Sequence, residues 1–229
     1  NQNLYGIFPM IVGSLYVTAG AMIVGVPGGL LTALYFSRFA RGRTGSFLRS
    51  GVELLAGIPS VVYGFFGLVI IVPFVRLLGP GTGLSVLAAS LILGIMILPT
   101  VITVAQSALD AVPARYYEGA LALGVDHEHA VFKVVAPAAA SGIMAAIVLG
   151  LGRAIGETMA VVMVAGNMPI IPDSLLSGVR TMTANIVLEM GYAADLHREA
   201  LIATGVVLFV FILLITMLLN VIRKRGEAR

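Results

Sequence analysis

Long apolar runs that are almost free of charge are the feature that most constrains this chain. A helix crosses a bilayer with about 20 largely apolar residues, and five runs meet that length, at residues 7–36, 48–77, 84–109, 134–165 and 200–222. Only 11% of the 229 residues are charged, against about 25% in soluble domains. So few charges cannot cover a water-facing surface. The sequence predicts an all-α, polytopic membrane protein, with residues 1–229 forming one transmembrane domain.

Glycine and proline interrupt the first two runs. The first contains Pro27 next to a glycine pair, which favours a kink, and the second is interrupted at Gly57-Ile58-Pro59. Backbone groups freed by a break are tolerated at membrane depth only against protein or water. Pro59 and Ser60 are therefore candidates for lining a pathway or forming a hinge, with a simple packing kink as the alternative. Tyr63 fits packing and polar lining equally well.

The remaining charges gather in three segments, and these predict the orientation of the chain. The segments at 37–49, 110–133 and 223–229 hold most of the basic residues, and with five crossings they fall on one side of the membrane. Because Lys and Arg in short loops favour the cytoplasm, that side and the C-terminus are predicted to be cytoplasmic. The loop at 166–199 then faces outward, as does the start of the chain. An outward start fits a preceding helix that the sequence lacks, although a complete five-helix chain is the alternative.

Several classes of protein are excluded or disfavoured. There is no cysteine for a disulfide or thiolate site, no phosphate-binding loop of the Walker type and no Ser–His–Asp set, so neither ATP hydrolysis nor other enzymatic chemistry is expected of this chain. The net charge of +3 is spread over short loops, which does not suit nucleic-acid binding. His127 and His129 flank Glu128, but with no third ligand nearby they indicate a solvated turn, not a metal site.

The charged segment at 110–133 alternates polar and apolar residues at helical spacing, as short amphipathic helices outside the bilayer core do. It contains Glu118-Gly119-Ala120, then three residues, Gly124, nine residues, and Val134-Val135-Ala136-Pro137. Gly124 permits a left-handed turn between two short helices, and Pro137 is tolerated at the start of the next span. Such an elbow suits docking in the groove of a soluble partner. The alternative is an ordinary surface loop.

The fourth run carries two charges, Arg153 and Glu157. Each costs at least about 2.5–3.5 kcal/mol at the bilayer centre, so such residues usually face a polar cavity and pair. On a continuous helix these two share a face and are expected to touch, while Gly152 and Gly156 are expected to admit a neighbouring helix. A guanidinium suits an oxyanion, which makes Arg153 a candidate anion contact near the break of the second run. A purely structural salt bridge is the alternative.

Two sets of residues resemble a known family. The spacing of the elbow resembles the EAA signature of importer permeases of the ATP-binding-cassette (ABC) superfamily, with departures at Gly119, Val134 and Ala136. Gly-Leu-Gly-Arg-Ala-Ile-Gly-Glu-Thr-Met-Ala-Val at 150–161 and Ile-Pro-Ser-Val-Val-Tyr-Gly at 58–64 are similar to phosphate-importer permeases of the PstC type. The resemblance implies a MetI-like permease core in the cell inner membrane, lacking the usual N-terminal helix.

The same resemblance implies a function and partners. The chain would translocate inorganic phosphate, with a sister permease, two ATP-binding subunits that carry ATP and Mg, an extracytoplasmic phosphate-binding protein and membrane lipid around it, and no cofactor of its own. The implied coupling residues are Glu118, Gly119, Ala120, Gly124 and Pro137, and the implied pathway residues are Pro59, Ser60, Tyr63, Arg153, Glu157 and Thr158. A molybdate or sulfate permease, a stand-alone channel or ion-coupled carrier, and a structural membrane anchor are the alternatives.

Overall fold

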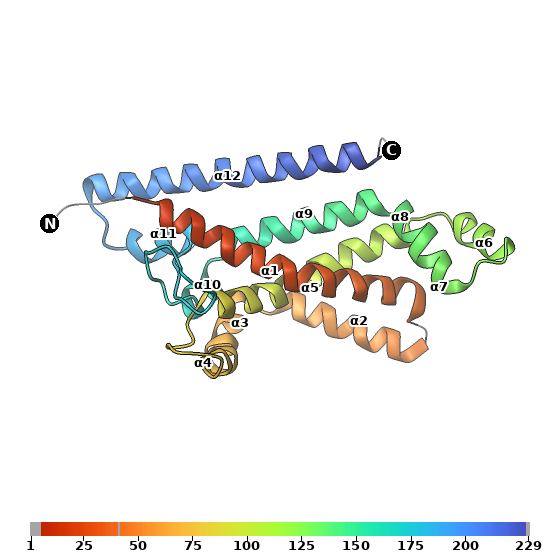
Figure 1. The fold of residues 1–229 in the computed structure, drawn as a ribbon, viewed down its shortest axis with the longest axis horizontal. Coiled ribbons are helices and arrows are strands. Elements are labelled where there is room, and N and C mark those ends of the chain that lie inside the picture. The colour runs from red at the N-terminus through yellow and green to blue at the C-terminus, as the bar shows by residue number, and fades with distance from the viewer. Residues whose placement is uncertain (1–5, 41, 228–229) are drawn as a thin grey trace.

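The computed structural model describes residues 6–40 and 42–227, in which the regular structure is helical apart from one isolated bridge between Gly166 and Val179. Figure 1 shows a bundle of long helices, with α6 and α7 projecting at one end. In chain order the helices are α1 (Phe8–Leu34), η1 (Tyr35–Phe39), α2 (Gly42–Gly57), α3 (Ser60–Phe66), η2 (Gly67–Ile71), α4 (Val72–Arg76), α5 (Val86–Asp110), α6 (Ala114–Ala122), α7 (His127–Ala130), η3 (Val131–Val135), α8 (Ala136–Ala138), α9 (Ala140–Gly156), α10 (Met159–Val164), α11 (Met182–Met190) and α12 (Asp195–Glu227). The predicted all-α fold is confirmed.

Three helices are long and apolar enough to cross a membrane unbroken, and two more candidate spans are bent. The unbroken spans are Phe8–Phe39, Val86–Asp110 and Asp195–Leu219. Gly42–Gly57 and Ser60–Arg76 meet at 100°, and His127–Ala138 and Ala140–Gly156 meet at 70°. These elements confirm the five predicted runs. They also move the bounds of the fourth run, because its helix bends near residue 139 and ends at Gly156, well before residue 165.

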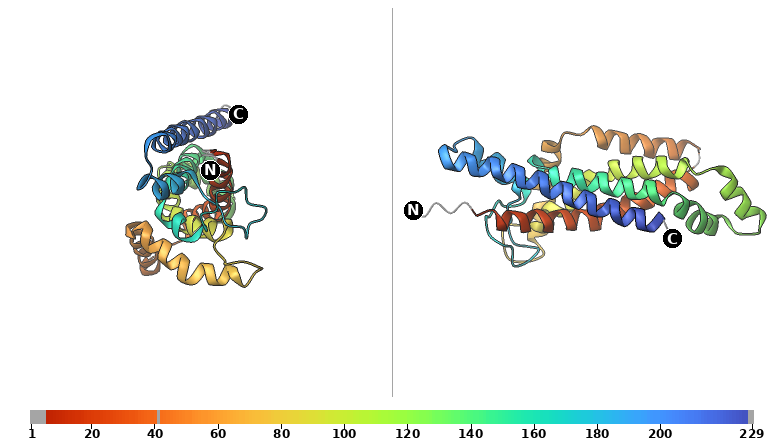
Figure 2. Two further views of the ribbon diagram at one scale, coloured as in Figure 1. Left: turned by 90° about the vertical axis from the view of Figure 1, so that its left-hand side faces the viewer. Right: turned by 90° about the horizontal axis from the view of Figure 1, so that it is seen from above.

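The core forms where α1, α5 and α9 pack against one another. Of the three unbroken spans, α5 is the most enclosed, with 67% of its most apolar window buried, whereas the corresponding share for α12 is 11%. Glycines bring the helices close: a Cβ atom on Gly29 would lie 2.7 Å from Val101 Cγ1, and one on Gly142 would lie 2.3 Å from the Cβ of Ala108. Figure 2 shows α12 lying along the outside of this bundle. The central helix is therefore α5, and α12 is peripheral.

The tight contact between α1 and α5 gives a first prediction. A Cβ atom on Gly25 would lie 2.5 Å from Ile97 Cγ1 and 2.7 Å from the carbonyl oxygen of Gly94, whereas one on Gly28 would make only an ordinary contact with Leu98, at 3.4 Å. Gly25→Ala is expected to destabilise the protein by about 1–3 kcal/mol through overpacking. Gly28→Ala, the matched control, is expected to stay within about 1 kcal/mol of the parent. Thermal unfolding of the two purified variants checks the difference; equal stabilities would contradict the packing argument.

The segment at 166–199, predicted as an outward loop, is largely packed against the end of the bundle. Helix α11 lies in it and contacts both α1 and α12. The N–H of Met182 donates to Ser14 Oγ of α1 at 3.0 Å, and Thr183 and Asn185 are buried. The segment therefore forms part of the folded core and holds the ends of α1 and α12 together.

Candidate functional site

The fourth membrane run breaks at Glu157. Helix α9 ends at Gly156, Glu157 is extended with φ −67° and ψ 138°, and α10 begins at Met159. The Glu157 carboxylate turns toward the new helix, where its Oε1 accepts hydrogen bonds from the N–H groups of Thr158 at 3.0 Å and Ala160 at 3.3 Å. These are N–H groups at the start of a helix, which have no partner within it. Glu157 therefore caps α10.

Side-chain hydrogen bonds stabilise the break between α9 and α10. Thr183, in the first turn of α11, donates its hydroxyl to the backbone carbonyl of Glu157 at 2.9 Å. Thr158 donates its own hydroxyl to the carbonyl of Gly156 at 3.3 Å. Both carbonyls lie where the helical ladder has stopped, so these bonds replace the ones that a continuous helix would have made. The interruption is thus built into the fold by α11.

Arg153 does not contact Glu157, so the expected pairing across one helix face is wrong. Its Nη1 donates to Thr100 Oγ1 of α5 at 3.3 Å, and among the described residues the ion pairs involve other groups. The physical reason is the break, which leaves the N–H groups of Thr158 and Ala160 without helical partners, and the Glu157 carboxylate turns toward them and away from Arg153. The Arg153 side chain lies exposed on the surface of the chain.

The glycines beside Arg153 have no close neighbour within the part of the chain that the structure describes. A Cβ atom on Gly152 or Gly156 would meet no atom within 4 Å, while one on Gly150 would lie 2.9 Å from Val101 Cγ2. Helix α9 therefore packs on α5 through the side that carries Gly150. The side that carries Gly152, Arg153 and Gly156 is left open. Because a charge does not face hydrocarbon without large cost, this open face has to meet water or another protein.

The break in the second run lies close to the break at Glu157. Pro59, with ψ 143°, separates α2 from α3, and buried Tyr63 donates its hydroxyl back across the break to the carbonyl of Leu55 at 2.8 Å. A Cβ atom on Gly64 would lie 2.9 Å from the Cα of Ala160, so α3 packs directly on α10. The breaks at Pro59 and Glu157 are therefore joined by the contact between α3 and α10.

Other pathway candidates differ in placement. Ser60 is half-buried at the first position of α3, whereas Pro59 is exposed on the surface of the chain. Thr158 is half-buried within the second break. The sequence analysis missed Thr100, the hydrogen-bond partner of Arg153. Its position could have been found from the polar residues that follow it on α5 at intervals of three and four.

The elbow predicted from spacing is present as two arms. Helix α6 forms the first arm, Gly124 turns the chain with φ +82°, and the second arm runs through α7, η3 and α8. Glu118, Gly119 and Gly124 are exposed, Ala120 is buried, and Pro137 lies in the first turn of α8 as expected. Figure 1 shows the elbow beyond the end of the membrane helices. Its exposed residues are therefore accessible to a partner.

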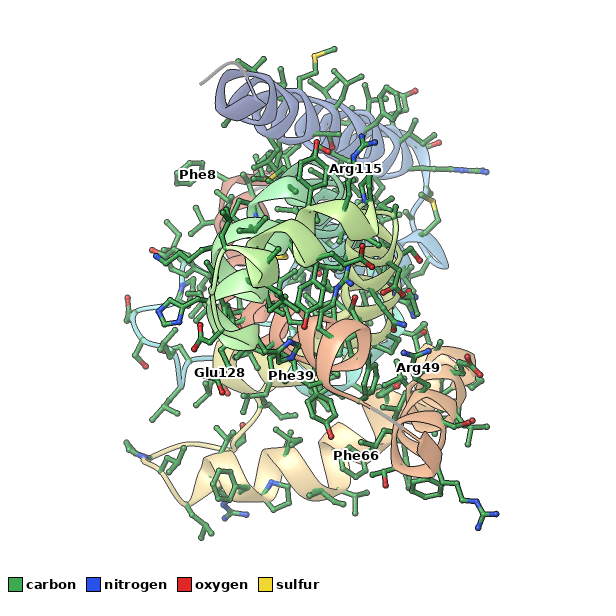
Figure 3. The ribbon with its side chains drawn as sticks, turned by 90° about the vertical axis from the view of Figure 1, so that its right-hand side faces the viewer. Phe8, Phe39, Arg49, Phe66, Arg115 and Glu128 are labelled. Carbon is green, nitrogen blue, oxygen red and sulfur yellow. The ribbon has the colours of Figure 1, made fainter. Side chains whose placement is uncertain are left out.

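The two arms are fastened to each other and to α1 and α5. Tyr117 Oη and His127 Nδ1 lie 2.7 Å apart, and the Phe39 ring meets the His127 ring edge-on with 4.7 Å between centroids. Arg38 lies over the Tyr117 ring at 6.0 Å and donates from Nη2 to the carbonyl of Leu109 at 2.8 Å. Figure 3 looks onto this end of the molecule and labels Phe39 and the neighbouring Glu128. A displacement of the elbow therefore reaches α1 and α5 as well as α9.

The two histidines of the elbow each have a side-chain partner. His127 contacts Tyr117 and Phe39, whereas His129 bonds Asp126 at 2.6 Å. Within residues 6–40 and 42–227 no three His, Cys, Asp or Glu side chains gather closely enough to hold a metal ion. The two histidines have structural partners in different directions.

A second polar cluster lies at the opposite end of the bundle, around Arg180. Arg180 Nη1 forms an ion pair with Glu189 Oε1 at 2.7 Å, and its Nε donates to the carbonyl of Asn167 at 3.0 Å. Hydrogen bonding to the Glu189 carboxylate raises the pKa of the Tyr192 phenol. A cavity of about 310 Å³ lies beside the pair, between the start of α1, α11 and α12. The guanidinium is already used by these partners, so the cluster fastens α11 to the preceding loop.

Known proteins share both the sequence pattern and the fold. Residues 25–227 match the family model of the binding-protein-dependent transport system inner membrane component. A Bacillus subtilis chain described as "Probable ABC transporter permease protein YqgH" is 38% identical over 97% of this chain and 73% of its own. The phosphate transport system permease protein PstC of Mesorhizobium japonicum is 33% identical over 98% of this chain and 75% of its own, and PstC 1 of Mycobacterium tuberculosis is 35% identical over 98% and 72%.

Solved structures support the same fold. A chain of the MetNI methionine ABC transporter in an inward-facing conformation superposes with a TM-score of 0.70 at 21% identity, covering 96% of this chain and 94% of its own. At that identity the likeness concerns the fold alone, and it confirms a MetI-like permease core. Together with the five candidate spans and the exposed elbow, these matches establish that the chain belongs to the family of binding-protein-dependent transport system inner membrane components, the membrane-spanning permease subunits of ABC importers.

Proposed function

We propose that this permease translocates inorganic phosphate into the cytoplasm, with Arg153 as the anion contact. The observation that carries the proposal is the exposed Arg153 guanidinium, which lies on the open face of α9 in the last turn before the break at Glu157. It is the one Lys or Arg in the runs at 7–36, 84–109, 134–165 and 200–222. The names of several relatives, PstC among them, support phosphate as the solute.

The missing contact with Glu157 strengthens the role proposed for Arg153. Only one of its N–H groups is used in the hydrogen bond to Thr100, at a long 3.3 Å. Glu157, directed at the backbone of α10, does not bond the guanidinium. A planar guanidinium with several donors fits two phosphate oxygens at once. Glu157 acts instead by capping α10, and so it stabilises the break that ends α9 beyond Arg153.

The proposed partners follow from the surfaces that the chain leaves uncovered. A sister permease covers the open face with Gly152, Arg153 and Gly156, so that the phosphate path lies between the two subunits. The elbow, with Glu118, Gly119, Ala120, Gly124 and Pro137, docks on cytoplasmic ATP-binding subunits, which supply ATP and Mg; the C-terminus is cytoplasmic. A phosphate-binding protein delivers the anion on the other side. Pro59, Ser60, Tyr63 and Thr158 complete the pathway near Arg153.

Uptake by the native complex tests this function. The complex is purified from its own membranes, reconstituted in vesicles with its binding protein, and supplied with labelled phosphate with and without ATP. We expect uptake that requires ATP and that excess sulfate or molybdate does not displace. Preferential uptake of sulfate or molybdate would overturn the choice of solute. Uptake without ATP or an ATPase would instead indicate an ion-coupled carrier.

A further inference from the structure

The half of α5 nearer the elbow, residues 100–110, is called its inner half. It carries a polar face that extends beyond the proposed anion contact at Arg153. α5 is otherwise strongly apolar, which makes it a candidate membrane span. From the contact with Arg153 to the elbow, its polar side chains all fall within about one third of the helix circumference. They are Thr100, Thr103, Gln106, Ser107 and Asp110. This polar face begins where Arg153 is bonded to Thr100 and runs toward the end of the helix at Asp110.

The same side of α5 is covered in its outer half and open in its inner half. Ile92, three turns before Thr103, is fully buried and lies 2.6 Å from the place of a Cβ atom on Gly67 of η2. Thr103, Ser107 and Asp110 are exposed. Polar side chains at this depth face water or protein and not lipid tails. The inner polar face therefore borders the same open region as Arg153.

A second guanidinium lies beside the middle of this face. Arg49 of α2 donates from Nη2 to the carbonyl of Phe36 at 2.6 Å. It lines a cavity of about 150 Å³ together with Glu53 of α2 and with Thr103 and Gln106 of α5. The cavity thus brings one guanidinium and one side-chain amide to a common space on the elbow side of Arg153. Both groups are hydrogen-bond donors.

The polar side chains in and beside this cavity differ in how strongly they are hydrogen-bonded to other groups of the protein. The hydroxyl of Thr103, which lines the cavity, donates to the carbonyl of Pro99 at 2.8 Å, and that of Ser107, one turn further along α5, donates to the carbonyl of Thr103 at 2.8 Å, so both present oxygen atoms along the polar face. Gln106 Nε2 is held only weakly, by Asp110 Oδ2 at 3.4 Å. Asp110 also accepts a bond from Ser37 at 2.5 Å. An oxyanion entering the cavity would therefore be recognised by Arg49 and the Gln106 amide, while the hydroxyl oxygens hold water.

We propose that Arg49 and Gln106 form a second, weaker oxyanion site on the inner half of the path, which receives the anion released from Arg153 along the polar face of α5. The inference rests on the proposed function and takes inorganic phosphate as its ligand. Glu53 lines the same cavity and opposes a bound anion. That opposition suits an exit site, because conduction requires binding that is favourable enough to enter and weak enough to leave.

The test compares variants in the intact, reconstituted complex with labelled phosphate. Arg49→Gln and Gln106→Leu each remove a donor and are expected to lower the maximal uptake rate about tenfold, as loss of one hydrogen bond to a charged ligand would. The external phosphate concentration for half-maximal uptake should stay unchanged, because the outer half of the path is intact. Phosphate loaded inside the vesicles should also inhibit the variants less than the parent. Arg43→Gln removes an exposed charge from the same helix and serves as the matched control, with parental uptake expected.

Further variants and outcomes separate the inference from folding and from the proposed function. Gln106→Glu keeps the shape of the side chain and replaces donors by a negative charge, so it should slow uptake at least as much as Gln106→Leu. Parental uptake by Arg49→Gln and Gln106→Glu, in a complex whose Arg153→Ala variant is inactive, would overturn the inner site alone. A parent complex that takes up sulfate in place of phosphate would overturn the solute, and the same variants are then scored with sulfate. Equal losses in Arg43→Gln would show that charge on α2, and not this cavity, is responsible.

Discussion

Replacing Arg153 by alanine is expected to abolish phosphate uptake while leaving the transporter assembled. Each hydrogen bond to a charged group contributes about 1.5–3 kcal/mol, so loss of a two-pronged contact should lower the rate about 100-fold or more. Folding should be little affected, since the side chain is exposed and its hydrogen bond with Thr100 is long at 3.3 Å. Initial rates of labelled phosphate uptake in vesicles, with co-purification of the partner subunits as the check on assembly, measure both effects.

Two further variants show which property of Arg153 matters. Arg153→Lys keeps the charge but loses the planar fork, so partial uptake is expected. Thr100→Val removes the hydrogen bond that Arg153 donates to Thr100 and is expected to change uptake far less than loss of the guanidinium. If Arg153→Ala instead released the partner subunits, the residue would be structural and the proposed anion contact would be wrong.

Changing the elbow at Glu118 and Gly124 is expected to separate ATP hydrolysis from transport. Gly124 has φ +82°, while proline is restricted to φ of about −65°, so Gly124→Pro cannot preserve the turn between the two arms. Glu118→Lys reverses an exposed charge on the first arm. With both changes, the complex should still hydrolyse ATP but take up almost no phosphate. Simultaneous assays of phosphate release from ATP and of labelled phosphate uptake give the ratio of uptake to hydrolysis.

The control for the elbow is a second left-handed glycine at the same end of the molecule. Gly42, with φ +66°, opens α2 and lies outside the elbow. Gly42→Pro imposes the same backbone conflict there and should leave the ratio of uptake to hydrolysis near that of the parent. Full uptake by the Glu118→Lys, Gly124→Pro variant would show that the elbow does not transmit the work of the ATPase.

Hydropathy and turn chemistry predicted the parts of the fold that depend on local sequence. The break at Pro59 was predictable, since proline disfavours a helical residue before it and removes a donor. The elbow was predictable because a single glycine at residue 124 stands between two amphipathic patterns. In both cases the residue that causes the feature lies within it. Such features need no knowledge of the rest of the chain.

The break at Glu157 could not be predicted in this way. No proline marks it, and the interrupted backbone is stabilised by Thr183, 26 residues later in the sequence. Arg153 was therefore paired with the wrong residue. The same limit applies to Arg49 and Gln106, which come from different helices and share a cavity only once α2 lies against α5. Tertiary contacts decide these positions.

The small buried share of α12, 11%, contrasts with the open face around Arg153. Lipid tails are as apolar as leucine, so an uncovered α12 is at no disadvantage in a bilayer. An uncovered guanidinium is at a disadvantage there, because no lipid tail can solvate its charge. The chain therefore has a lipid side and a protein side, distinguished by which neighbour each one tolerates. A second subunit approaching from the lipid side would gain little, and one approaching along α9 and α5 relieves the cost of the charge. The surface of this chain alone therefore favours assembly along α9 and α5 over assembly along α12.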